Sequence, residues 1–212
     1  MRKGFGVCCI ILGVFCLFAS LGFILYNHHE EEIAQIASKD ILQDVRVNIP
    51  DTPNDETILE ESISEEFVRE EHVEPIDDIP QEMLTAKVDG YDCIGILSIP
   101  VLELELPILT DWSYQKLKIA PCHYYGSYYE ENFVIAAHNN KYHFGRLSEL
   151  QANDFILFTD ISGTVYCYKV VLLETLPGNA TEEMISSGFD LSLYTCTPGG
   201  SNRVTVRCDL VQ

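Results

Sequence analysis

An apolar run near the N-terminus is the longest hydrophobic feature of the chain, because residues 5–26 contain no charged side chain. A helix rises about 1.5 Å per residue, so a run of this length covers a hydrocarbon core of roughly 30 Å. No small-residue cleavage site follows it, as one would in a signal peptide. We therefore expect residues 1–26 to form a cytoplasmic tip and a retained transmembrane anchor.

Charged residues flank this run unequally. Arg2 and Lys3 precede it, and three consecutive glutamates follow it at residues 30–32. The positive-inside bias then leaves the N-terminus in the cytoplasm and the rest of the chain outside. The predicted localisation is the cell membrane, with a single pass and an extracytoplasmic domain.

Apolar positions become sparse over residues 27–86, which carry 18 acidic and 3 basic side chains. Ile33, Ile36, Ala37 and Ile41 could form one short amphipathic helix. We interpret the segment as a largely disordered acidic spacer, because like charges repel and little apolar surface is available for burial. An acidic tail that binds a partner or cations is the alternative.

Short apolar and alternating segments, separated by glycine-containing turns, are typical of residues 87–212. Many short strands with few helices favour a closed barrel or a sandwich. Strands are expected at residues 94–99, 102–106, 133–137, 154–159, 164–173, 191–196 and 203–211. Helical segments are expected at residues 113–120, 144–150 and 181–187, the last with Thr181 as its N-cap.

Strand parity assigns faces in the last two strands. Val206 and Cys208 share the expected core face, whereas Arg203 and Arg207 share the other face. Cys196 ends the preceding strand on its outer face, just before the turn at residues 197–202. The hairpin is therefore expected to hold Cys196 and Arg203 near each other.

Charge and cysteine content narrow the function. With 33 acidic against 13 basic side chains the net charge is −20, which excludes a nucleic-acid partner because phosphate binding needs a basic face. Residues 87–212 hold five cysteines, an odd number, so at least one thiol has no partner within the molecule. Cys167 and Cys208 lie mid-strand, and we expect both to be buried and inert.

Cys196 is the candidate nucleophile, because it ends a strand and precedes a Pro-Gly-Gly turn. A neighbouring cation favours the thiolate, and Arg203 could supply that charge together with donors for an oxyanion. A nucleophilic cysteine also needs a histidine, for which His138 at the exit of an apolar strand is suited. A zinc site using His138 and His143 is the alternative, but no Cys-x-x-Cys or His-Glu-x-x-His spacing supports it.

These residues resemble a known family. The sequence LYTCTP at residues 193–198, followed by Arg203 opening the next strand, resembles the signature of the sortases. AAHN at residues 136–139 is similar to their histidine-bearing strand end, and FGRL at residues 144–147 to the helical turn that follows it. IGILSIP at residues 94–100 resembles their opening strand. The resemblance covers about residues 90–212.

The resemblance implies a mainly β domain at residues 87–212, a closed eight-stranded barrel with short helices. It also implies a cysteine transpeptidase of Gram-positive bacteria, a peptidase-like enzyme counted among the hydrolases, of class D-like or unclassified clostridial type. The short stretch at residues 174–190 differs from the class B layout. A calcium site at Glu182 or Glu183, as in class A, is an alternative to their simpler role in the first turn of a helix.

The resemblance also implies residue roles. Cys196 would attack the carbonyl of an LPxTG-like sorting motif near the C-terminus of a secreted protein and form a thioacyl-enzyme. His138 would protonate the leaving amine and deprotonate the incoming one, and Arg203 would stabilise the oxyanion. Ala137, Thr195 and Asn139, which flank Cys196 and His138, are expected to bind substrate. The acceptor would be an amine of the cell wall or a pilin lysine, and no cofactor or metal is required.

Three points stay open at the level of the sequence. Arg207 is an alternative to Arg203, since both share one strand face. A cysteine hydrolase with the same thiol and histidine would transfer the acyl group to water instead. A non-enzymatic, membrane-tethered binding module would hold Cys196 in a structural disulfide, for example with Cys208.

Overall fold

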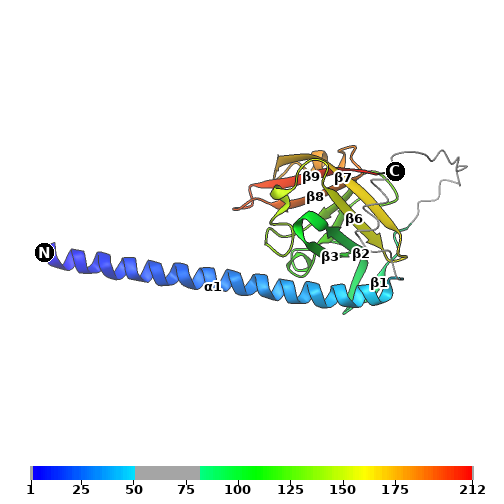
Figure 1. The fold of residues 1–212 in the computed structure, drawn as a ribbon. Coiled ribbons are helices and arrows are strands. Elements are labelled where there is room, and N and C mark those ends of the chain that lie inside the picture. Colours follow the sequence, from blue (N-terminus) through cyan, green and yellow to red (C-terminus); the bar gives the residue numbers. More distant parts are fainter. Residues whose placement is uncertain (1, 51–81, 212) are drawn as a thin grey trace, which may run out of the picture.

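A long helix runs beside a β-barrel in the computed structural model, which describes residues 2–50 and 82–211 (Figure 1). The helix, α1 (Arg2–Asn48), is long and apolar enough to cross a membrane. Its most apolar window has a mean hydropathy of 2.2 and none of that window is buried. Most of the expected acidic spacer, residues 51–81, lies outside the described residues.

The helix does not end where the apolar run ends. It continues through residues 27–48, so this part of the expected disordered spacer is helical instead. No glycine or proline interrupts the chain between Gly22 and Pro50, and a proline disfavours helix in the residue before it. Helix propensity therefore outweighs the low apolar content of this segment.

The second half of α1 packs on the barrel through a narrow seam. Ala34, Ser38, Ile41 and Val45 are buried at a spacing of four, three and four residues, which is one helix face. The prediction of the apolar face was wrong in part, because Ile33 and Ile36 are exposed. Small side chains at 34 and 38 let the helix approach the barrel closely, which the larger isoleucines would prevent.

The described residues form a sheet of nine strands, and eight of these close the barrel. The strands are β1 (Ala86–Val88), β2 (Tyr91–Ile99), β3 (Leu104–Leu109), β4 (Cys122–Tyr125), β5 (Phe133–Ala136), β6 (Phe155–Asp160), β7 (Val165–Pro177), β8 (Leu191–Cys196) and β9 (Asn202–Leu210). From β2 the order runs β2-β3-β4-β5-β8-β9-β7-β6, and β6 pairs back with β2. Strand β1 adds to β2 outside this circuit. The prediction of a closed eight-stranded barrel is confirmed.

Short helices connect the strands. They are η1 (Pro100–Leu102), η2 (Lys116–Lys118), η3 (Leu147–Glu149) and α3 (Thr181–Ile185). Several expectations change here. Leu102 lies in η1 rather than in a strand, and Ala180 takes the N-cap position expected for Thr181. The helical segments expected at residues 113–120, 144–150 and 181–187 shorten to η2, η3 and α3. A left-handed Glu103 (φ 50°) turns the chain, so the next strand begins at Leu104.

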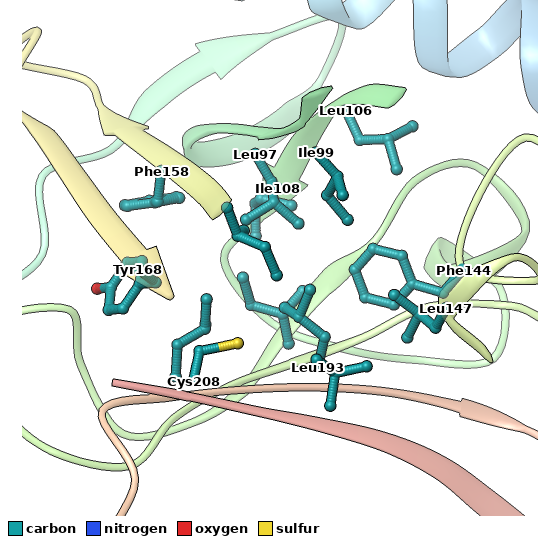
Figure 2. Packing of buried hydrophobic residues seen from close by; sticks show 14 of the residues in the cluster. Leu97, Ile99, Leu106, Ile108, Phe144, Leu147, Phe158, Tyr168, Leu193 and Cys208 are labelled. Carbon is teal, nitrogen blue, oxygen red and sulfur yellow. The ribbon is translucent and has the colours of Figure 1, made fainter. Parts of the chain in front are cut away.

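Apolar side chains from every strand of the circuit except β4 fill the barrel (Figure 2). Leu97, Phe158 and Leu193 are almost completely buried. Leu147 and Leu150 of the turn around η3 point into the same core, as their spacing predicted. A second cluster, which includes Ile41 of α1, lies between that helix and strands β2 to β4. The barrel thus has its own core, and α1 covers an outer apolar face.

Gly95 sits where β2 closes the barrel against β6, and a Cβ there would contact the Thr159 carbonyl oxygen and, at 2.8 Å, the Phe158 ring. Gly95→Ala should lower the free energy of unfolding by about 2–4 kcal/mol. Gly90→Ala is the matched control, because its φ is +83° but its Cβ would meet open space, so it should cost only about 1–2 kcal/mol. Denaturant unfolding followed by circular dichroism measures both, and equal losses would contradict a steric origin.

Candidate active site

Two parallel strands carry His138 and Cys196 to one edge of the barrel. In the β5–β8 pair Ala136 lies opposite Tyr194, and the pairing continues beyond β5 with a hydrogen bond from Ala137 N to Tyr194 O (3.1 Å). The carboxyl ends of adjacent parallel strands meet at the same sheet edge. His138 and Cys196 each follow two residues after the last paired positions, so they leave that edge side by side.

Cys196 and Arg203 face each other across the β8–β9 hairpin, where they are direct partners in the register. The turn between them is closed by a hydrogen bond from Thr197 N to Asn202 O (2.9 Å) and uses Gly200 at a φ of +76°. Directly opposed residues of an antiparallel pair point to the same face. The prediction that Cys196 and Arg203 share a face is confirmed.

A cavity of about 230 Å³ is lined by His138, Cys196 and Arg203 together. Trp112, Tyr114 and Tyr124, which we call the aromatic wall, form part of its lining. The Trp112 ring stacks on Tyr124 at 5.9 Å between centroids and meets Tyr114 edge-on at 5.3 Å. Residues 177–184, before and within α3, contribute a further part of the lining. The cavity thus combines the polar corner of His138, Cys196 and Arg203 with an apolar surface.

Burial separates Cys196 from the other barrel cysteines. Cys196 is partly exposed, whereas Cys93, Cys122, Cys167 and Cys208 are buried, and all five are free thiols. Burial raises the pKa of Cys93 to about 11 and that of Cys122 to about 12, and it also raises the pKa of Cys208. These buried thiols therefore stay protonated, as expected for Cys208. The disulfide considered between Cys196 and Cys208 is not formed.

His138 is half-buried at the cavity. Burial, and then the nearby Lys118 ammonium, lower the pKa of the imidazole below its usual value. The loop after it is tightly bonded, because His138 O accepts hydrogen bonds from Asn140 N (2.9 Å) and Phe144 N (3.2 Å). The loop thus fixes the backbone of His138, and the imidazole favours its neutral form, which can accept a proton.

The two arginines considered for the site have different environments. Arg203 is partly exposed, and its Nη1 donates to Gly200 O (2.9 Å) and Asn202 O (3.0 Å) of the turn. Arg207 is 1% exposed and does not line the cavity. The hairpin therefore aims one arginine at the cavity and buries the other.

Arg207 ties α3 to the barrel. Its Nε donates to Glu174 Oε1 (2.8 Å), and its Nη1 donates to Ser192 Oγ (2.7 Å). The guanidinium also donates to the carbonyls of Glu183 (2.7 Å) and Met184 (3.2 Å) in α3. Since the Met184 side chain lines the cavity, Arg207 shapes the site indirectly.

The three residues expected to bind substrate lie in different places. Ala137 lines the cavity. Thr195 does not: it is 2% exposed, and its hydroxyl donates to Ala137 O (2.8 Å). That bond joins the two strands that carry His138 and Cys196, so Thr195 stabilises the pairing of these strands. Asn139 is exposed and lines a separate groove beside α1.

Among the side chains that the structure describes, no group of three or more histidines, cysteines, aspartates or glutamates is arranged to hold a metal ion. His143, the second residue of the considered zinc pair, is fully buried. Its Nδ1 lies 3.4 Å from Asn140 Nδ2. The environment of His143 is that of a buried neutral side chain.

Sequence reasoning did not identify the aromatic wall or the role of α3. The signal for the wall is the density of aromatic residues between positions 112 and 129. The wall residues follow no strand or helix period, because Trp112 and Tyr114 lie on the irregular connection from β3 to β4 and Tyr124 lies on the short β4 itself.

A closed eight-stranded barrel with this cysteine, histidine and arginine around one cavity has the architecture of the sortase class. A sortase domain model matches residues 97–211, more than half of the chain. The chain belongs to the sortase family. No curated protein sequence matches it.

Solved sortase structures share the fold. Sortase A from Corynebacterium diphtheriae is 25% identical with a TM-score of 0.52, and the alignment covers 57% of this chain and 62% of that one. Sortase C from Clostridium perfringens SM101 is 25% identical (TM-score 0.51, 57% and 71% covered). The pilus-related sortase C of Group B Streptococcus is 26% identical (TM-score 0.51, 57% and 68% covered). The chain thus spans less than two thirds of the diphtheria enzyme.

The arginine assignment predicts losses of stability that differ in size between the two positions. Arg207→Met leaves Glu174 without its buried partner and should lower the free energy of unfolding by about 3–5 kcal/mol. Arg203→Met is the matched control and should cost less than about 1.5 kcal/mol, because only hydrogen bonds to turn carbonyls are lost. Thermal and denaturant unfolding of both variants checks this, and a larger loss at Arg203 would reverse the assignment.

The burial of His143 predicts a pH dependence of stability. Burial, and then the neighbouring His138, lower the pKa of His143 to about 4, whereas an unfolded histidine titrates near pH 6.5. Between these values the unfolded chain binds the proton and the folded chain does not. The contribution of His143 to the free energy of unfolding is therefore fully present above about pH 6.5. It falls by about 3 kcal/mol as the pH drops to 4. Unfolding curves of the wild type and His143→Met should diverge over this window, and parallel curves would contradict the assignment.

Proposed function

We propose that the protein is a membrane-anchored cysteine transpeptidase that cleaves a short sorting motif and transfers the acyl part to an amine. The observation that carries the proposal is the convergence of Cys196, His138 and Arg203 on one cavity. The sortase family membership supports the same reaction.

In the first half-reaction Cys196 supplies the nucleophile and His138 transfers the proton. His138 takes the thiol proton, and the thiolate attacks the carbonyl carbon of the scissile peptide bond. A C–S bond forms, the C–N bond breaks, and the imidazolium returns the proton to the leaving amine. A neutral resting imidazole, which the burial of His138 favours, is the form that can accept the thiol proton.

In the second half-reaction an acceptor amine attacks the thioester. His138 takes the proton of the amine, a new C–N bond forms, and the C–S bond breaks to release the Cys196 thiolate, which is reprotonated. The products balance the reactants without an external oxidant, reductant or cofactor. We propose a cell-wall or pilin amine as the acceptor.

We propose that Arg203 stabilises the negative charge that develops on the carbonyl oxygen. Within the described part of the chain its hydrogen bonds are made by Nη1, which the turn carbonyls fix in place. Nη2 and Nε of the planar guanidinium then remain for the substrate oxygen. Such preorganised donors are worth about 3–4 kcal/mol of transition-state stabilisation each.

The aromatic wall suits an apolar part of the motif, because Trp112 and Tyr114 offer partly exposed rings next to the reactive corner. We propose an LPxTG-like motif at the C-terminus of a secreted protein as the substrate. The N-terminal half of α1 is proposed to anchor the enzyme in the cell membrane, with the barrel on the extracytoplasmic side.

Intact-mass measurement of the full chain in detergent, incubated with a pool of LPxTG-like and NPxTN-like peptides, tests this function. A thioacyl adduct should form on the wild type and disappear in Cys196→Ala. Cys208→Ala is the matched control and should keep the adduct, because that thiol is buried in the core. His138→Gln should slow adduct formation at least 100-fold, and Arg203→Gln by about 100- to 1,000-fold.

Added amine distinguishes the two acyl acceptors. In a transpeptidase, the adduct should disappear faster as the concentration of an amine such as triglycine is raised, and the product should be the amide. Release that yields only acid at every amine concentration would indicate a hydrolase. A folded protein with a free Cys196 and no adduct with any peptide would contradict the proposal.

A further inference from the structure

The end of the apolar run lies next to the catalytic edge of the barrel. Asn27, the residue after the run, and Glu30 line a groove of about 540 Å³ on the side of α1. Lys118 and His138 line the same groove from the barrel. His138 therefore borders both this groove and the cavity that holds Cys196.

One ion pair links this end of the barrel to α1, and the acidic charge of the helix also acts on a lysine of the barrel. Lys118 Nζ lies 3.6 Å from Glu30 Oε2. Lys141 lies three residues after His138. Its pKa is raised first by the contact with Tyr142 and then by the charges of Glu31 and Glu32 in α1. The helix η2, which precedes β4, and the loop after β5 thus both face the part of α1 that follows the apolar run.

The helix is also fixed at its far end. The seam from Ala34 to Val45 is buried against the barrel, and Arg46 forms an ion pair with Glu105. No glycine or proline separates the apolar run from this seam. The barrel cannot change its distance from the apolar run without breaking these contacts or the helix itself.

The distance along the helix is short. Glu30 lies four residues beyond Tyr26, which corresponds to about 6 Å at the helical rise. The polar layer on each side of a bilayer is roughly 5–7 Å thick. If residues 5–26 span the membrane, Lys118 and the His138 edge lie at the level of the lipid headgroups. Figure 1 agrees, since the β8–β9 turn points along α1 towards its N-terminal half.

We propose that α1 is a rigid spacer that holds the active-site edge at the membrane surface and thereby makes the enzyme selective for the distance between motif and membrane. This rests on the proposed function for its substrate. For a polypeptide held in the same membrane, the number of residues between the sorting motif and the bilayer becomes a specificity element. A motif too close to the bilayer cannot reach Cys196, and the minimum spacing is set by α1.

The position of the site can be tested without catalysis. The full chain with Cys8, Cys9 and Cys16 replaced by alanine is labelled with a fluorophore on Cys196 and reconstituted in phosphatidylcholine vesicles that contain a rhodamine headgroup lipid. Seven helix-forming residues inserted after Tyr26 should move the label about 10 Å away from the surface. Energy transfer to the headgroups should fall on insertion. Unchanged transfer would overturn the proposed placement.

The selectivity is tested with motif peptides attached to a lipid anchor through Gly-Ser linkers of increasing length, in the same vesicles. The insertion should lengthen the shortest reactive linker by about three residues, since an extended residue spans roughly 3.3–3.6 Å. The rate on a soluble motif peptide is the control and should be equal in both proteins, because the barrel is unchanged. An unchanged shortest linker would overturn the spacer role.

The two proposals fail in different ways. If neither protein reacts with the soluble peptide, the proposed function is wrong, and the selectivity built on it falls too. If both react with the soluble peptide at equal rates and the linker threshold does not move, the transpeptidase stands and the spacer is rejected. Lys118→Glu gives a further check, because repulsion from Glu30 loosens the contact between barrel and helix. The reaction rate should then rise gradually with linker length instead of at a sharp threshold.

Discussion

The parallel pairing of β5 with β8 is the constraint on which the site depends. It brings together His138 and Cys196, which are 58 positions apart in the chain. The Thr195 hydroxyl, hydrogen-bonded to Ala137 O at 2.8 Å, reinforces the pair one residue before Cys196 and one residue before His138. Arg203 is then added by the β8–β9 hairpin, whose turn fixes its position relative to the cysteine. The geometry of the site is thus a property of the backbone pairing, and loops only complete it.

Burial assigns different roles to chemically identical groups. Burial keeps the thiols of Cys93, Cys122 and Cys208 protonated, whereas Cys196 is open to the cavity. Arg207 donates hydrogen bonds to Glu174, Ser192 and the carbonyls of α3, whereas part of the Arg203 guanidinium faces the cavity. Two arginines four residues apart on one strand face therefore differ because α3 covers one of them. The loop that carries α3 is in this way coupled to the barrel beneath it.

Much of the barrel follows from the sequence. Strand β8 occupies the predicted residues 191–196, and the facing of Cys196 and Arg203 follows from alternation alone. Adjacency of β5 and β8 does not, because a parallel pair joins segments distant in the chain. The continuation of α1 past Tyr26 was missed because apolar content was weighed above the absence of helix breakers. The difference between the two arginines depends on packing from α3, which no local pattern contains.

The chain has a single tryptophan, Trp112, and it stands in the aromatic wall of the cavity. Its indole is partly exposed and stacks on Tyr124, which in turn meets Tyr194 edge-on. A peptide that fills the cavity must displace water from this ring. The protein therefore carries its own optical reporter of occupancy, and the intrinsic emission of Trp112 can follow binding separately from the chemistry at the thiol.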